Sequence, residues 1–92
     1  MQFMPKLGKF LRENGVIYTV RKYKMADKIV DAEWVGYCKR TYLGKVKDFK
    51  DLEPFVKESG FETVEDWWEK IKEFIPSKKD SMYLYKVERI RR

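Results

Sequence analysis

The sequence predicts a single α+β domain over residues 1–92, a small barrel-like sheet of five or six strands with two helices inserted before the last strand. The spacing of the hydrophobic residues predicts this class. Up to about Asp51 they alternate as in strands, from there to Pro76 they recur at helical spacing, and beyond Pro76 they alternate again as in a strand. The chain length is consistent with a single domain, because 92 residues support one core. An aromatic content of 16% supplies the large side chains that a small core needs.

Segments rich in β-branched and aromatic residues define the predicted strands, which are residues 16–23, 30–37, 38–47 and 82–90. Within the third strand, Gly44 indicates a bulge or a sharp bend. Before the first strand, residues 7–13 can form one or two helical turns. The last strand follows the helices in the chain and must pair back into the sheet, and a short twisted sheet of this kind tends to curl into a barrel.

Two helices are predicted between the third and the last strand. Asp51 is a suitable N-terminal cap for the first, which ends at Ser59 and Gly60. Thr63 caps the second helix and Pro76 ends it. The apolar residues of this second helix recur at helical spacing and are predicted to be buried: Val64, Trp67, Trp68, Ile71, Phe74 and Ile75.

Composition excludes several kinds of site and suggests a location. Cys38 is the single cysteine, which rules out an intramolecular disulfide and a cysteine-based zinc cluster. Histidine is missing, which rules out a nucleophile activated by imidazole, and no metal or cofactor is expected. Residues 1–9 lack the apolar stretch of a signal peptide, so we expect a cytoplasmic protein with no membrane partner. The high charged fraction of 39%, with one Gln and one Asn, suggests a thermophilic source.

The net charge of +6 is unevenly distributed along the chain. Residues 1–47 carry a balance of +7 and residues 76–92 one of +4, whereas residues 48–75 carry −5. A fold that joins the first and last segments in one sheet would have a basic face, which attracts phosphate groups. A solvated surface without a partner is the alternative for any single lysine.

The stretch Tyr18-Thr19-Val20-Arg21 after Gly15 resembles the signature of ASCH domains, which are relatives of the PUA RNA-binding fold. The order and spacing of the predicted elements resemble this family from about Gly15 to Ile90. The resemblance implies a PUA-like barrel with a cleft beside the first strand that receives RNA or a modified nucleoside. Thr19 and Arg21 match the family pattern, whereas the family's signature lysine is replaced by Val16 or Ile17.

The predicted function is that of an RNA- or nucleotide-binding module. Arg21 can clamp a phosphate with two hydrogen bonds, although an ion pair with Glu33 or Glu58 is an equal alternative. Aromatic residues interleaved with cations favour single-stranded nucleic acid, although most aromatic residues in a short chain form its core. The predicted binding residues are Thr19, Arg21, Lys22, Tyr23, Lys39, Arg40, Lys45 and Arg89.

Two other functions remain open. An ASCH amidohydrolase that acts on acetylated cytidine nucleosides resembles this chain, and by that resemblance Thr19 and Glu58 would be catalytic. The missing lysine argues against this enzyme, because a threonine hydroxyl without an activator is a weak nucleophile. A protein-interaction domain is the other possibility, favoured by the acidic segment 48–75.

Overall fold

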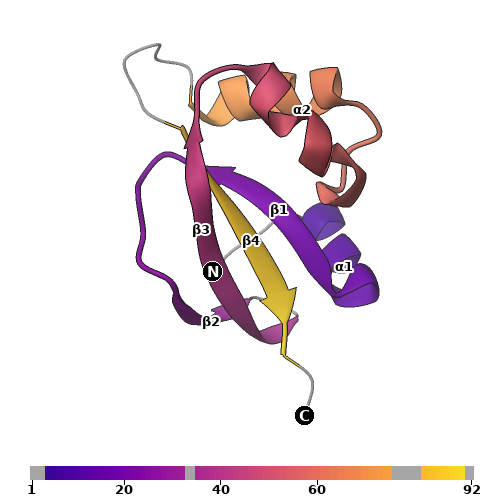
Figure 1. Cartoon of the computed structure of the whole chain (residues 1–92). Coiled ribbons are helices and arrows are strands. Elements are labelled where there is room, and N and C mark those ends of the chain that lie inside the picture. The colour runs from indigo at the N-terminus through magenta and orange to yellow at the C-terminus, as the bar shows by residue number, and fades with distance from the viewer. Residues whose placement is uncertain (1–3, 33–34, 76–81, 91–92) are drawn as a thin grey trace.

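A computed structural model describes residues 4–32, 35–75 and 82–90 of the chain. It is an α+β fold in which three helices pack on a four-stranded antiparallel sheet (Figure 1). In chain order the elements are α1 (Pro5–Asn14), β1 (Val16–Arg21), β2 (Lys28–Ala32), β3 (Gly36–Val46), the 3-10 helix η1 (Phe49–Glu58), α2 (Val64–Phe74) and β4 (Met82–Arg89). The predicted order of strands and helices after residue 15 is therefore confirmed.

The sheet has the strand order β1-β4-β3-β2, with every neighbouring pair antiparallel. β4 lies in the middle, where Tyr85 is paired with Thr19 of β1 on one side and with Tyr42 of β3 on the other. The register of β3 against β4 shifts between Tyr42 and Gly44, which confirms the predicted irregularity at Gly44. β1 and β2 are the two edges of this sheet.

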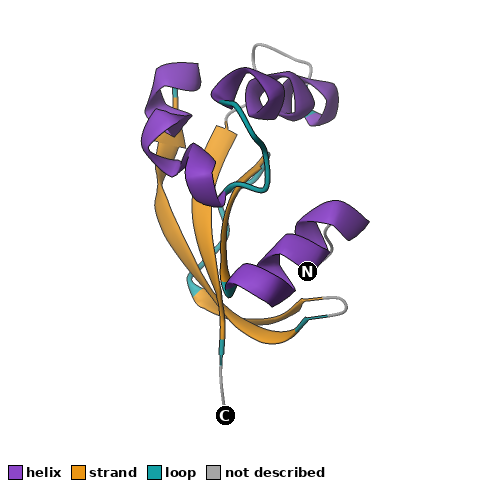
Figure 2. Ribbon diagram, turned by 90° about the vertical axis from the view of Figure 1, so that its right-hand side faces the viewer, coloured by secondary structure: helices purple, strands orange, loops and turns teal. Residues whose placement is uncertain are grey.

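The predicted barrel of five or six strands is not confirmed, because the described residues form four strands in an open sheet. Helix α1 gives a physical reason for the open form. Its Leu11 is fully buried in one cluster with Ile17 of β1 and Val30 of β2. Figure 2 shows α1 against one face of the sheet, above the bent β2–β3 hairpin. Apolar side chains of the helix therefore fill the space between the two edge strands, which curl toward each other without pairing.

Helices η1 and α2 cover part of the opposite face. Trp67 and Ile71 of α2 are buried with Leu52 of η1 and Leu84 of β4. Trp68 is partly buried against this cluster. The prediction that Phe74 belongs to the core is wrong, because 64% of its surface is exposed. Phe74 lies in the last turn of α2, which borders an open cleft where no strand covers it.

The helix caps are in part as predicted. Thr63 caps α2 by accepting a hydrogen bond from the Asp66 amide at 3.1 Å. The cap of η1 is Asp48, and the predicted cap Asp51 is instead the third residue of the helix. The carboxylate of Asp51 accepts hydrogen bonds from the amides of Lys47 and Asp48, and these bonds lower its pKa. Pro76 and the loop that follows it lie outside the described residues.

No helix among residues 4–32, 35–75 and 82–90 combines the length and the apolar character needed to cross a bilayer.

Cys38 provides a test of the packing between α1 and the sheet. The thiol is fully buried, and this burial raises its pKa above the ordinary value. Because the thiolate is the reactive form, a thiol reagent at pH 8 should label the folded protein far more slowly than the urea-unfolded chain. The raised pKa also means that the stabilisation from the buried thiol is complete below the pKa of the unfolded chain and is lost as the pH rises through the folded value. Rapid labelling in native buffer would contradict this packing.

Candidate functional site

A cleft of about 1050 Å³ lies beside β1. It is lined by the end of β1, by β2, by the connection of residues 22–27 and by one side of α2, with further residues from the start of α1, from β3 and from the loop before α2. Five of the predicted binding residues line it. Thr19, Arg21, Lys22 and Tyr23 come from β1 and its end, and Arg40 comes from β3, which lies two strands away from β1 in the sheet. A concave site of this size fits a small ligand or a segment of a larger one.

The charge of the cleft is strongly positive. Five of the described residues that line it are cations, namely Arg21, Lys22, Lys28, Arg40 and Lys70. Asp31 is the one carboxylate among the described residues that line the cleft. A concave surface with this excess of positive charge concentrates anions, and phosphate above all.

The α2 side of the cleft is largely apolar. Phe61, Trp67, Ile71 and Phe74 line it, and Trp67 is buried whereas Phe74 is exposed. Tyr23, at the rim, exposes 69% of its surface. Exposed aromatic rings next to cations are suited to stacking with nucleobases. The cleft therefore combines cations, four of which come from the strands and the connection of residues 22–27, with aromatic residues that come mainly from the α2 side.

Two buried side chains fix the connection of residues 22–27, which forms one wall of the cleft. The hydroxyl of Tyr85 donates a hydrogen bond to the Tyr23 carbonyl at 2.9 Å and accepts one from the Met25 amide. Arg40 Nη2 donates to the Ala26 carbonyl at 2.9 Å, and the guanidinium lies 5.8 Å from the centre of the Tyr85 ring. The wall is therefore held in place from the centre of the sheet.

Arg21 and Arg40 are close enough to influence each other. Burial lowers the pKa of Arg21, and the positive charge of Arg40 lowers it further. Thr19 is also buried and lies on the same face of β1 as Arg21, two residues away. Three of the predicted binding residues, Thr19, Arg21 and Arg40, thus line the same cleft and carry groups that can donate hydrogen bonds to a phosphate.

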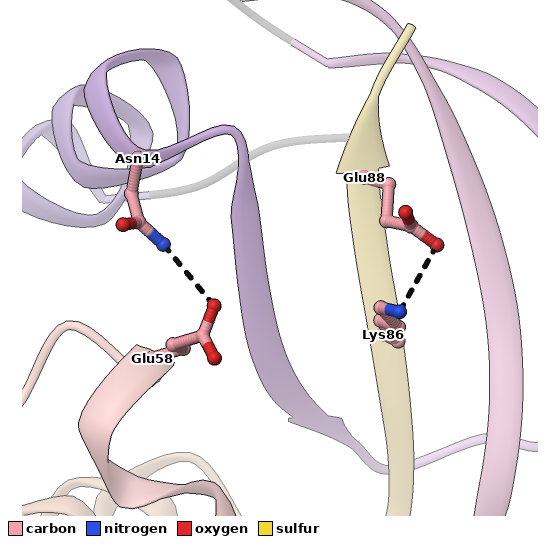
Figure 3. Close-up of polar contacts among 4 residues, drawn as sticks. All are labelled: Asn14, Glu58, Lys86 and Glu88. Atoms are coloured by element: carbon pink, nitrogen blue, oxygen red, sulfur yellow. Dashed lines mark hydrogen bonds and ion pairs between the residues drawn. The ribbon is translucent and has the colours of Figure 1, made fainter.

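Glu58 lies away from these residues. Its carboxylate accepts a hydrogen bond from the Asn14 side chain at 3.4 Å, and it does not line the cleft (Figure 3). Thr19 and Glu58, the pair suggested for an amidohydrolase, are therefore not brought together in the cleft. Glu33, the other predicted ion-pair partner of Arg21, lies outside the described residues.

Three predicted binding residues lie elsewhere. Lys39 and Lys45 of β3 are exposed and do not line the cleft. Lys39 is paired with Glu88 of β4, which forms an ion pair with Lys86 at 3.3 Å (Figure 3). The guanidinium of Arg89 donates a hydrogen bond to the Arg12 carbonyl at the end of α1. Arg89 therefore has a structural contact that accounts for its position.

Lys28 and Lys70 line the cleft although they are not among the predicted site residues. Lys70 belongs to the acidic segment, where the local charge balance hides a single lysine. Lys28 begins an edge strand, and only the curvature of the sheet brings it opposite β1. Neither residue has a local sequence signal that would identify it.

Comparison with known proteins adds no relative: no protein-family model matches the chain, and no curated protein or solved structure matches it. Within the described part of the chain, no group of three or more His, Cys, Asp or Glu side chains could hold a metal ion. The candidate site is thus defined by its shape, its charge and its aromatic rim.

Proposed function

We propose that the protein binds RNA or a nucleotide-like ligand in the cleft beside β1. The observation that carries this proposal is the composition of the cleft: its described lining residues include five cations and one carboxylate. Phe74 and Tyr23 add exposed aromatic surface at its border. Phosphate groups would bind the cations, and a base would stack on an aromatic ring at about 1–3 kcal/mol per base.

The ASCH-like assignment belongs to the same proposal. Thr19 and Arg21, which match the family pattern, both line the cleft. The curled sheet, with two helices before its last strand, is compatible with an incomplete PUA-like barrel. Under this proposal the site beside the first strand is the one that the resemblance implies.

A titration with a short fluorescent single-stranded RNA tests the proposal. Affinity should fall steeply with salt, with a log–log slope of about −0.7 for each phosphate that the cations neutralise. Arg21→Gln should lower the affinity more than Lys28→Gln, because a guanidinium can make two hydrogen bonds to one phosphate. Lys39→Gln and Lys45→Gln are matched controls that remove the same kind of charge outside the cleft, and they should have small effects.

Two results would point to another function. Release of acetate from acetylated cytidine, lost in Thr19→Ala, would indicate an amidohydrolase. Absence of RNA binding at low salt would contradict the proposal and favour a protein partner for the acidic helices. Equal effects of Arg21→Gln and Lys39→Gln would indicate that RNA binds outside the cleft.

A further inference from the structure

Arg40 is a buried cation on the floor of the cleft. Only 7% of its surface is exposed, although the residue lines the cleft. Its Nε atom is buried and has no hydrogen-bond partner among the described residues. Buried polar atoms in native proteins nearly always have a partner, so an unsatisfied one calls for an explanation such as a ligand or an ion.

The contacts that Arg40 makes with other described residues are all with neutral groups. They are the Ala26 carbonyl, the Met25 sulfur at 3.4 Å and the Tyr85 ring, and all three groups are neutral. No carboxylate of the described residues forms an ion pair with it. A buried charge that lacks an opposite charge is costly, whatever its neutral contacts.

A second guanidinium shares this environment. Arg21 lines the same cleft, and the positive charge of Arg40 acts on it. Thr19, whose exposure is 8%, lies two residues from Arg21 on the same face of β1 and adds a hydroxyl donor. Two cations and a hydroxyl that border one floor are a suitable set of donors for a compact anion.

We propose that Arg40, Arg21 and Thr19 form a subsite for a terminal phosphate, so that the cleft prefers ligands that end in a phosphomonoester. This inference rests on the proposed function and names the part of the ligand that enters deepest. The unsatisfied Nε of Arg40 would donate to one phosphate oxygen, and the Thr19 hydroxyl would donate to another.

Charge and depth both favour a terminal phosphate over an internal one. A phosphomonoester carries a charge of about −1.5 to −2 at pH 7 and three acceptor oxygens, which matches two guanidinium groups. An internal phosphodiester carries one negative charge and continues into the chain on both sides. Thr19 and Arg40 are each more than nine-tenths buried, so a group at the end of a chain reaches them more easily than a group within it.

The wild-type protein allows a direct test with three versions of one short RNA, which carry a 5′-phosphate, a 3′-phosphate or hydroxyl groups at both ends. One phosphorylated version should bind about 10 to 100 times more tightly than the hydroxyl version, the effect expected for hydrogen bonds to a charged group. The comparison of the 5′ and 3′ versions identifies the end that enters. Equal affinity of all three would overturn this inference while leaving the proposed function intact, whereas failure of all three to bind would contradict the proposed function itself.

Variants connect the preference to the residues. Arg21→Gln should reduce the ratio of the affinities for phosphorylated and hydroxyl RNA to near one, whereas Lys39→Gln, on the opposite side of β3 from Arg40, should leave the ratio unchanged. Arg40→Gln should act in the same way if its thermal unfolding shows that it is folded. Inorganic phosphate should displace the phosphorylated RNA, and this competition should weaken in Arg21→Gln. An unchanged ratio in Arg21→Gln would contradict the subsite even if Arg40→Gln does not fold.

Discussion

Replacing Trp67 by alanine is expected to destabilise the protein by about 3–5 kcal/mol, the range for deleting a large buried aromatic side chain. Only 3% of Trp67 is exposed, and its ring is stacked with that of Phe61 at a centroid distance of 6.5 Å. It packs in the cluster that joins α2 to Leu84 of the sheet. Urea unfolding followed by circular dichroism measures the effect.

The neighbouring aromatic residues of α2 are matched controls. Trp68→Ala should cost less than Trp67→Ala, because Trp68 is partly exposed. Phe74→Ala should change the free energy of unfolding by no more than about 0.5 kcal/mol, as is usual for an exposed position. Under the proposed function, Phe74→Ala should instead weaken RNA binding. Equal costs for Trp67→Ala and Phe74→Ala would show that α2 is rotated relative to the sheet.

Tyr85→Phe should have the second large effect, on both stability and binding. The change removes one hydroxyl that serves as acceptor for the Met25 amide and donor to the Tyr23 carbonyl. Both hydrogen bonds are partly buried, and leaving the partners of such bonds unsatisfied costs about 1–3 kcal/mol. The connection of residues 22–27 would lose its attachment to the sheet, so hydrogen exchange at the Met25 amide should accelerate and RNA affinity should fall.

Tyr83→Phe is the control for this change. Tyr83 is two residues before Tyr85 on the same strand, and no hydrogen bond of its hydroxyl is found among the described residues. Tyr83→Phe should therefore change the free energy of unfolding and the hydrogen exchange of the Met25 amide only slightly. If both variants behaved alike, the hydroxyl of Tyr85 would not be what fixes the wall of the cleft.

Local patterns explain which features of the fold could be predicted. β-branched residues, the Thr63 cap and the bulge at Gly44 are local signals, and the structure has each of them. Whether the sheet closes into a barrel depends on how α1 packs against it, and this packing is a long-range property of the chain. The sequence predicts helical turns around Leu11, but no neighbouring residue indicates that Leu11 packs between β1 and β2.

The same distinction applies to the candidate site. Thr19, Arg21, Lys22 and Tyr23 are near neighbours in the chain, so one strand and its end carry them to the cleft together. Lys39 and Arg40 are both cations, and charge alone predicts that they share a site, whereas adjacent residues of a strand point to opposite faces. Strand alternation alone could therefore have shown that one of these two belongs elsewhere. Arg40 lies on the same face of β3 as Cys38, which packs in one cluster with Leu11 of α1, and this long-range packing has no local signal in the sequence.

The central position of β4 also affects how the chain can fold during synthesis. Val16 pairs with Glu88, so the first described strand finds its partner only in the last one. Until residues 82–89 have left the ribosome, β1 has no neighbouring strand in the described sheet, and β2 with β3 can form only an isolated hairpin. Contacts between such distant segments slow folding, because a long loop must close before they form. The nascent chain would thus expose its apolar strand faces until β4 is made. A chaperone would be of most use during this period.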